Sequence, residues 1–524
     1  MKKICFITLM VVSTIIGKSQ NYFETLIQSE DGINREGKFA VETRDHGYII
    51  SCDAQYIFQN DMLVKLSPEG DLTNRLIFQI DDKNIKYCGL FHHPNNDNEY
   101  LAVTALAAGS GFSDFLQHEI ALIIFDNELN VLSQTIIDFG DEYTQLATGN
   151  KDMPRFILEE NGTITMAAHC RKTESSCYLF AKFALDGQIL EMVESDFLSA
   201  TSNYLFNAFS KRRSDGSFGM VLYDNRGGEA YYEVDSLFNI TRVGKLSDRA
   251  IKVVPAPQGT IPDSTYYYIG IQGTVEYLND SVFLASSSGM FLRHVGGITG
   301  YCHFLAMFSD SLDVADIRVW DIYKDEPNYK KKTLPARDKA IGVTDDAIFH
   351  CGVLGLKDHG HYSTGSIAPS TLTISKFDRE LNLIWRRYIN KNENFYDINV
   401  IQATEDGGCI INGIFSKSES YYNFYSYVHK FDADGYDSVD EAESIARPYL
   451  CYPNPTKDNL YIDLSPDVNC QSIEIYDIDG RLVETFPETS QQTTIDISGL
   501  HAGMYIVKLR MANGKEYEER IIKK

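Results

Sequence analysis

A polar turn between two apolar strand ends recurs along most of the chain, and this repeat restricts the fold more than any other feature. Seven copies occur at spacings of 51 to 74 residues: KLSPEGDL at Lys65, IFDNELNV at Ile124, KFALDGQI at Lys182, EVDSLFNI at Glu233, MFSDSLDV at Met307, KFDRELNL at Lys376 and KFDADGYD at Lys430. An apolar strand that ends in a polar turn, and mostly resumes after it, is typical of a β-hairpin.

A second turn precedes each copy of the first. The seven segments are RDHGYII at Arg44, PNNDNEYLAV at Pro94, EENGTITM at Glu159, RSDGSFGM at Arg213, YLNDSVFLA at Tyr277, VTDDAIFH at Val343 and EDGGCIING at Glu405. Each unit therefore reads strand, turn, strand, loop, strand, turn, strand. Four short antiparallel strands in each repeat are typical of a propeller blade.

The two ends of this array predict how it closes. YFETLI, which begins at Tyr22, looks like the strand that follows the first kind of turn elsewhere, as in LIWRRYI at Leu383. The copy at Lys430 lacks a clear strand of that kind. We therefore expect the N-terminal strand to complete the seventh unit, which would remove open sheet edges. The prediction is an all-β, seven-bladed β-propeller over residues 20–436 of no named propeller family; two β-sandwiches are the alternative.

The N-terminus predicts export. Lys2 and Lys3 precede an apolar segment, and Gly17 and Ser19 supply small residues for a cut before Gln20. This pattern is typical of a signal peptide over residues 1–19, and the apolar stretch is shorter than a membrane span needs. No other segment is long and apolar enough to cross a bilayer, so we expect no transmembrane segment.

The composition excludes one class of partner. The formal net charge is −25, and such an acidic surface repels phosphate backbones, so no nucleic-acid partner is expected. Nine cysteines remain after residue 19, an odd number, and Cys170 and Cys177 flank a polar loop where they are placed to close a hairpin. The sequence contains no CxxC motif, so it gives no support for a zinc ribbon.

The C-terminal region reads as a separate β-unit. An acidic stretch over 437–448 lacks strand alternation and predicts a linker. Beyond it, alternating apolar residues and the turns Asp479-Gly480 and Asn513-Gly514 predict a compact Ig-like sandwich over 449–524.

Four motifs in this unit carry a resemblance. They are YPNP at Tyr452, IYDIDGRLV at Ile475, DISGLHAGMYIVKL at Asp496 and NGK at Asn513, followed by a basic end. In this order they resemble the type A C-terminal sorting domain of cargo of the bacterial type IX (Por) secretion system; His501 stands where that family often has proline. The resemblance implies contact with the type IX machinery through residues 449–524, passage across the outer membrane and removal of the tail, with a cut near 442–448. An ordinary accessory β-sandwich is the alternative.

Candidate metal sites are few. His350-Cys351 and Asp358-His359-Gly360-His361 form the densest histidine region, and imidazoles two residues apart on a strand share a face. A polar loop between strands explains the same residues. His92-His93 precedes a turn and points its rings to opposite faces if the segment is extended. Asp432, Asp434, Asp437 and Asp440 resemble a calcium loop, but their spacing departs from an EF-hand and a solvated hairpin fits better.

No motif identifies a catalytic residue or a cofactor. GxSxG, HExxH, GxxxxGK and GxGxxG are all absent from the sequence, so the sequence predicts no catalytic residue and no cofactor and leaves metal binding unknown. Trp320 and Trp385 are expected in the core. The Gly-rich stretches 106–115 and 286–301 are expected to be long loops on a binding face.

Three functions remain open from the sequence. The leading one is a secreted or surface-displayed binding module for a glycan or protein. The alternative is a secreted hydrolase or lyase acting on polysaccharide or peptide in the central channel, and the third is a structural surface-layer component. Polar side chains clustered in the channel would favour the enzyme.

Overall fold

The computed structural model describes part of the chain, which is divided into two compact units. Those units are Met1–Asp437 (unit 1) and Ser438–Lys524 (unit 2). The described residues are 22–28, 33–54, 60–81, 83–108, 118–146, 153–195, 204–210, 214–224, 228–245, 251–252, 266–293, 297–309, 314–320, 331–357, 370–389, 394–416, 425–435, 449–452, 456–464, 470–477, 480–487, 492–511 and 516–524. The predicted signal peptide (1–19) and linker (437–448) lie outside them.

The described part of unit 1 consists of seven antiparallel sheets, numbered here in chain order. The first contains β2 (Arg35–Glu42), β3 (Tyr48–Ala54), β4 (Met62–Leu66) and β5 (Leu72–Ile77), and the second β6 (Lys83–His92), β7 (Glu99–Ala108), β8 (Glu119–Asp126) and β9 (Val131–Asp138). The third contains β10 (Tyr143–Gln145), β11 (Arg155–Leu158), β12 (Ile164–Lys172), β13 (Ser176–Phe183) and β14 (Ile189–Ser195). The fourth contains β15 (Tyr204–Ser210), β16 (Phe218–Asp224), β17 (Gly228–Val234) and β18 (Ile240–Lys245).

The other three sheets continue the same order. The fifth contains β19 (Ile251–Lys252), β20 (Tyr266–Asn279), β21 (Val282–Arg293), β22 (Gly297–Ser309) and β23 (Val314–Trp320). The sixth contains β24 (Lys331–Pro335), β25 (Ile341–Val343), β26 (Ile348–Lys357), β27 (Thr371–Phe377) and β28 (Leu383–Ile389). The seventh contains β29 (Phe395–Ala403), β30 (Cys409–Ser416), β31 (Tyr425–Phe431) and β1 (Phe23–Ile27). The all-β prediction is confirmed for the described residues, none of which lies in a helix.

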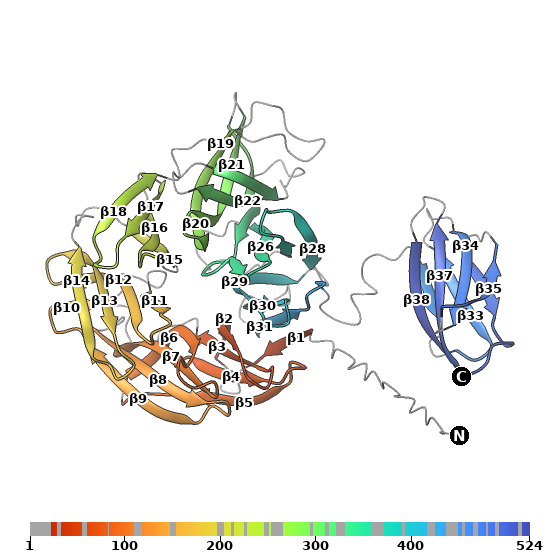
Figure 1. The fold of residues 1–524 in the computed structure, drawn as a ribbon, viewed down its shortest axis with the longest axis horizontal. Coiled ribbons are helices and arrows are strands. Elements are labelled where there is room, and N and C mark those ends of the chain that lie inside the picture. Colours follow the sequence, from red (N-terminus) through yellow and green to blue (C-terminus); the bar gives the residue numbers. More distant parts are fainter. Residues whose placement is uncertain are drawn as a thin grey trace, which may run out of the picture. The chain divides into compact units, whose positions relative to one another are not determined.

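One early strand from each sheet contacts its counterpart in the next sheet. In chain order these strands are β2, β6, β11, β15, β20, β25 and β29, and each contacts the next. The last of them, β29, contacts β2, so the contacts form a cycle. Figure 1 shows the sheets of unit 1 following one another around a common centre. The strands of this cycle are called the inner strands below.

The N-terminal strand joins the last sheet, as the sequence predicted. β1 pairs antiparallel with β31, with Phe23 opposite Lys430 and Ile27 opposite Ser426. Phe23 is buried and lies against Gly70, whose φ of +88° places it in the left-handed region. A Cβ at Gly70 would lie 2.3 Å from the Phe23 ring, so only glycine fits this turn of the first sheet. The first sheet therefore packs on the strand that completes the seventh.

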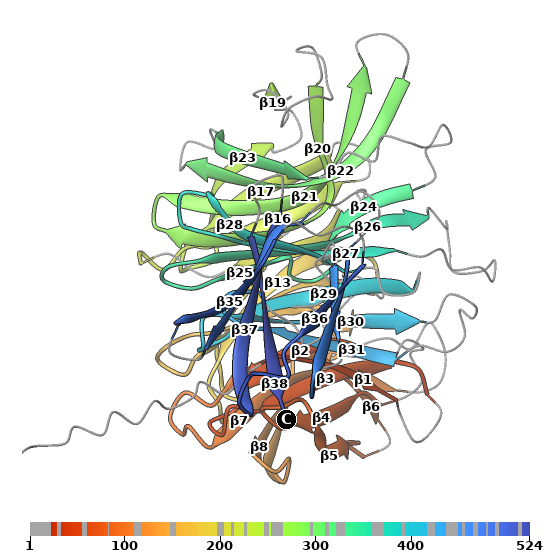
Figure 2. The same ribbon diagram turned by 90° about the vertical axis from the view of Figure 1, so that its right-hand side faces the viewer.

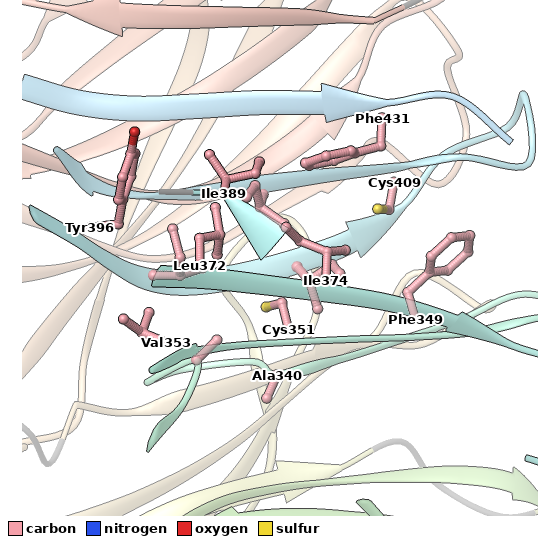
Figure 3. Close-up of a cluster of buried hydrophobic side chains, with 14 of the residues drawn as sticks. Ala340, Phe349, Cys351, Val353, Leu372, Ile374, Ile389, Tyr396, Cys409 and Phe431 are labelled. Atoms are coloured by element: carbon pink, nitrogen blue, oxygen red, sulfur yellow. The ribbon is translucent and has the colours of Figure 1, made fainter. Parts of the chain in front are cut away.

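Apolar side chains fill the spaces between neighbouring sheets. The cluster between the sixth and seventh sheets includes Phe349, Cys351 and Ile374 from one side and Tyr396, Cys409 and Phe431 from the other (Figure 3). Because strand side chains alternate between faces, each sheet can supply a core on both sides, which explains its almost continuously apolar middle strands. Each fully buried side chain of this size contributes about 1.5–3 kcal/mol.

The lysine that begins several of the repeat turns binds an aspartate in another turn of the same sheet. Lys430 is fully buried, and its Nζ donates to Asp406 Oδ2 at 2.7 Å and Oδ1 at 3.0 Å. In the first sheet, Lys65 Nζ donates to Asp45 Oδ2 at 2.7 Å. In both sheets the third strand thus holds the turn between the first two, which explains why a charged residue recurs beside an apolar strand.

Acid should weaken the Asp406–Lys430 pair. Burial tends to raise the pKa of Asp406, but the Lys430 charge and hydrogen bonds outweigh it and lower that pKa below its ordinary 3.8. A carboxylate with a lowered folded pKa contributes stability above its unfolded pKa and loses it as pH falls through the folded pKa. Asp406→Asn should therefore reduce the free energy of unfolding by about 1–3 kcal/mol at pH 7. Below pH 4 the free energy of unfolding of this variant should fall less steeply with pH than that of wild type.

Urea denaturation at pH 7, 5, 4 and 3 measures this effect. Asp186→Asn is the matched control, because Asp186 lies in an exposed turn and accepts the Gln188 amide at 3.0 Å. Equal acid sensitivity of wild type and Asp406→Asn would contradict the prediction.

Unit 2 is built from two sheets in its described residues. One contains β32 (Tyr449–Tyr452), β33 (Asn459–Leu464) and β36 (Gln492–Asp496). The other contains β34 (Cys470–Asp477), β35 (Leu482–Phe486), β37 (Gly503–Met511) and β38 (Glu516–Lys523), and Figure 2 shows β37 beside β38. Both sheets contribute to one buried cluster that includes Ile462, Ile475 and Val507. The sheets therefore share one core.

Two details of unit 2 match the sequence motifs. Gly480 follows Asp479 in the turn between β34 and β35 and has a φ of +77°. The Tyr505 hydroxyl donates to the carbonyl of His501 at 2.9 Å, so the motif tyrosine holds the segment before β37. The Asn513-Gly514 turn lies outside the described residues.

No helix in the described part of the chain is long and apolar enough to cross a membrane.

Candidate functional site

Charged side chains gather where inner strands of unit 1 meet. We call this group the central charge cluster: Glu36, Lys38, Asp53, Asp61, Lys86, Arg155, Arg337, Asp338 and Asp397. Its members come from the first, second, third, sixth and seventh sheets. Segments that are far apart in sequence supply them, so only the closed cycle of inner strands brings them together.

Lys86 organises one half of the cluster. Its Nζ donates to Asp53 Oδ1 at 2.6 Å, to Asp61 Oδ1 at 2.9 Å and to the Ala54 carbonyl at 2.6 Å. Lys38 Nζ reaches the other oxygen of Asp53 at 3.3 Å. Asp61 is fully buried and also accepts the backbone amides of Ala54 and Tyr87. Two ammonium groups and two carboxylates thus satisfy one another in a buried network.

The other half connects the sixth sheet to the third, the seventh and the first. Arg155 of the third sheet approaches Asp338 of the sixth, with Nη2 to Oδ1 at 3.3 Å. Arg337 donates to Asp397 of the seventh sheet and lies 3.9 Å from Glu36 Oε2. The segment around Arg337 is held against β29, because the Asp338 amide donates to the Asn399 carbonyl at 2.8 Å. This segment therefore brings two charges of opposite sign to the centre.

Repeated β-bulges shape the inner strands. On β2, two residues, Lys38 and Phe39, lie opposite the single residue Ser51 of β3. On β6 and β29 the extra residue, which has no partner of its own in the register with the neighbouring strand, is Cys88 and Asn399 respectively. A bulge re-aims the side chain of the extra residue. Asn399 Nδ2 donates to the Gly37 carbonyl at 2.9 Å and so connects the seventh sheet to the first. These bulges help to place polar groups inside an apolar assembly.

The ionisation of the cluster follows from burial and pairing. Burial lowers the pKa of an ammonium, but Asp53 and Asp338 outweigh this effect and raise the pKa of Lys38. Burial raises the pKa of Asp61 to about 7, and the neighbouring Asp53 charge adds to this rise. Burial likewise raises the pKa of Glu36, although the Arg337 charge opposes it. Glu36 Oε2 is buried and, within the described part of the chain, accepts no hydrogen bond.

The cluster is not sealed completely. Side-chain exposure reaches 31% for Arg337 and 22% for Asp338, against 1% for Asp61. The Lys86 half is therefore a buried support, and the Arg337 half presents charge to solvent. Chemically, the exposed half offers a guanidinium and carboxylates, one of which has a raised pKa.

The sequence did not indicate this cluster, although a signal was present. Glu36 and Lys38 lie two residues apart on a mostly apolar strand, and side chains at this spacing point to the same face of a sheet. Their partners lie up to 301 residues away, as from Glu36 to Arg337, and one sequence carries no information on that pairing.

The predicted histidine site divides into a described and an undescribed part. His350 is buried on β26, and its Nε2 lies 2.7 Å from the Ser286 hydroxyl of β21. The neighbouring Cys351 belongs to the core between the sixth and seventh sheets. Asp358, His359, Gly360 and His361 lie outside the described residues. His350 therefore joins two neighbouring sheets, and the metal site remains a prediction for the rest.

The other candidates lie mainly in turns or in the core. His92 is exposed and its ring lies 5.6 Å from that of Tyr100, while the His93 amide closes the following turn on Glu99. Asp432 accepts the Asp434 amide at 2.9 Å, as in an ordinary polar turn, and Asp437 and Asp440 are outside the described residues.

Trp385 is buried, as predicted, and donates Nε1–H to the Ala433 carbonyl at 3.0 Å. The side chain of Trp320 is outside the described set. Cys170 and Cys177 are both buried and lie opposite each other in the β12–β13 pair.

The expected loop at 286–301 is wrong. Most of that stretch belongs to the paired strands β21 and β22, with Ser288 opposite His303. The glycines suggested a loop, but cross-strand pairing over the whole length stabilises strands. Of the stretch 106–115, residues 106–108 belong to β7 and the remainder lies outside the described residues.

Solved structures with a similar backbone are distant. A crystal structure of the polysaccharide lyase Uly1 aligns with a TM-score of 0.43 and 11% identity over 81% of this chain and 94% of that one. The NanB sialidase of Streptococcus pneumoniae aligns with a TM-score of 0.37 and 10% identity, over 82% of this chain and 73% of that one. No curated protein sequence matches the chain.

The C-terminal unit does have an assignable family. Residues 450–524 match the family model of the secretion system C-terminal sorting domain. The match covers the four motifs quoted above and both sheets of unit 2. Residues 450–524 are thus a C-terminal sorting domain, and the chain is cargo of the type IX secretion system, exported to the cell surface or the extracellular space.

Proposed function

We propose that unit 1 is a seven-bladed β-propeller that acts outside the cell as a binding module for a glycan or protein. Two features support the ring: the inner strands contact one another in a cycle, and β1 completes the last sheet. In this proposal residues 1–19 are a removed signal peptide, 20–436 the propeller, 437–448 a linker, and 449–524 an Ig-like domain that engages the type IX machinery.

The exposed half of the central charge cluster carries the binding proposal. Arg337 and Asp338 lie at the meeting point of inner strands, are partly exposed, and are held there by the backbone of β29. Charges fixed on a rigid scaffold can bind a polar ligand without the entropy loss of ordering flexible side chains. A guanidinium beside carboxylates suits a ligand that carries both acidic groups and hydroxyl donors.

Arg337→Gln should weaken ligand binding at least tenfold. The change removes the charge that faces solvent, and a tenfold loss corresponds to about 1.4 kcal/mol. The chain without residues 1–19 would first be tested on glycan and protein arrays, and the ligand found would then be titrated by calorimetry. Arg242→Gln on β18, the last strand of the fourth sheet, is the matched control and should bind as wild type.

Two results would contradict the proposal. One is that the protein binds nothing on either array although its circular dichroism spectrum shows folded β-structure. The other is a ligand bound equally well by wild type and Arg337→Gln.

A hydrolase or lyase is the second candidate, because of one observation. Glu36 has a raised pKa, caused first by burial, and lies 3.9 Å from the Arg337 guanidinium. A carboxyl group whose pKa moves toward neutrality can transfer protons at physiological pH, and a nearby cation can neutralise developing negative charge. Release of new reducing ends or peptides from a polysaccharide and protein panel, lost in Glu36→Gln, would favour this function. An inactive wild-type chain would exclude it for the panel tested.

A further inference from the structure

Two tight turns at the seam between the first and seventh sheets bring three metal-ligating side chains together. Glu42 ends β2, His46 lies in the turn before β3, and Glu405 lies in the turn between β29 and β30. One ligand atom from each of the three lies within 4.8 Å of the others. The group lies at the opposite end of β2 from Glu36, so it is distinct from the central charge cluster.

The distances suit a small divalent cation. Glu42 Oε1 lies 3.6 Å from His46 Nδ1, which is beyond normal hydrogen-bond distance. Ligand atoms around a tetrahedral Zn²⁺ ion with bonds of about 2.0–2.2 Å stand roughly 3.3–3.6 Å apart. Small side-chain movements of the exposed His46 and Glu405 would therefore enclose an ion.

Glu42 provides a separate indication of a ligand. Its side chain is only 9% exposed, and within the described part of the chain no lysine or arginine forms an ion pair with it. The Glu405 amide donates to Oε2 at 2.9 Å, which leaves Oε1 directed at His46. A bound cation would compensate this buried carboxylate.

His46 occupies a turn position that glycine holds in two corresponding turns of other sheets. Among the described turns that directly follow an inner strand, the same hydrogen-bond pattern closes three, in which His46, Gly162 and Gly407 occupy the same position. Their φ angles are 61°, 83° and 80°, a region that glycine adopts readily and other residues rarely do. The first sheet therefore carries an imidazole where its counterparts carry no side chain.

We propose that Glu42, His46 and Glu405 bind one Zn²⁺ ion that links the first sheet to the seventh. An imidazole with two carboxylates is a donor set that zinc accepts, and three protein ligands leave a fourth position for water. The ion bridges the two sheets at which the ring closes, and so it stabilises that seam.

Titration of the metal-free chain with ZnCl₂ tests the site. Calorimetry of the chain without residues 1–19, after removal of metal by a chelator, should show one Zn²⁺ whose affinity falls at least tenfold in His46→Gly. The melting temperature of wild type, and not of the variant, should rise with ZnCl₂. His46→Gly is suited to this test because glycine is the residue of the equivalent turns, so the variant should fold.

Controls separate this site from others. His501→Ala, which removes an exposed imidazole of unit 2, should bind as wild type, and Glu405→Gln should lose affinity as His46→Gly does. Equal Zn²⁺ binding by wild type and His46→Gly would overturn the proposal, as would no binding by wild type. Tighter binding of Ca²⁺ than of Zn²⁺ at the same three residues would overturn the assignment of zinc.

Discussion

Deletion of residues 449–524 should leave the protein in the periplasm, with no detectable amount at the cell surface or in the medium. The C-terminal sorting domain directs type IX export, and unit 2 forms a compact unit apart from unit 1. Unit 1 should therefore still fold after the deletion but lose its route across the outer membrane. Cell fractionation with immunoblotting, together with protease treatment of intact cells, measures the location.

A point variant makes this test independent of the truncation. Ile475 is fully buried in the core shared by the two sheets of unit 2, so Ile475→Asp should unfold the tail and block export in the same way. Leu482→Asp is the matched control, because Leu482 is 55% exposed on β35 and should tolerate a charge. Surface display of the truncated chain at the normal level would contradict the sorting assignment.

Lys86→Met should destabilise unit 1 by about 3–5 kcal/mol, the usual effect of removing one partner from a buried ion pair. Lys86 is buried, and its ammonium donates to Asp53, Asp61 and the Ala54 carbonyl. Methionine has a similar volume but cannot donate, so two carboxylates would lose their shared counterion. Urea denaturation of the chain without residues 1–19, followed by tyrosine fluorescence, measures the change.

Lys83→Met on the same strand is the matched control. Lys83 pairs with Glu119, but its side chain is 27% exposed, and such a pair contributes about 0–1 kcal/mol. The double variant Lys86→Met/Asp61→Asn should be more stable than Lys86→Met alone, because it no longer contains the buried, uncompensated carboxylate of Asp61. Equal effects of Lys86→Met and Lys83→Met would show that the buried network contributes no more than a surface pair.

Much of the fold was predictable because its determinants are local. Turn residues, strand alternation and the spacing between turns act over a few residues, and these patterns located strands in all seven sheets of unit 1. The unfinished repeat at Lys430 and the extra strand at Tyr22 even predicted the pairing of β1 with β31. The stretch 286–301 failed because its glycines outweighed the strand pattern, whereas pairing with distant residues stabilises the strands.

The candidate sites were much less predictable. His350 was singled out for its place near other histidines, yet its ring bonds to Ser286 of another sheet. Glu36, Lys86 and Arg337 belong to no motif and became candidates only through their burial and their neighbours. Glu42 and Glu405 likewise lie 363 residues apart in the sequence.

The sequence by itself determined that this protein is exported, that its C-terminal unit is a sorting domain, and that the remainder is a β-repeat. Each of these properties is encoded in short segments that are complete in themselves. Only the tertiary structure decided which charges share the centre of unit 1 and which side chains meet at its closing seam. Both sites contain side chains more than 300 positions apart in the sequence, Glu36 with Arg337 in one and Glu42 with Glu405 in the other, and the closed cycle of inner strands brings them into contact.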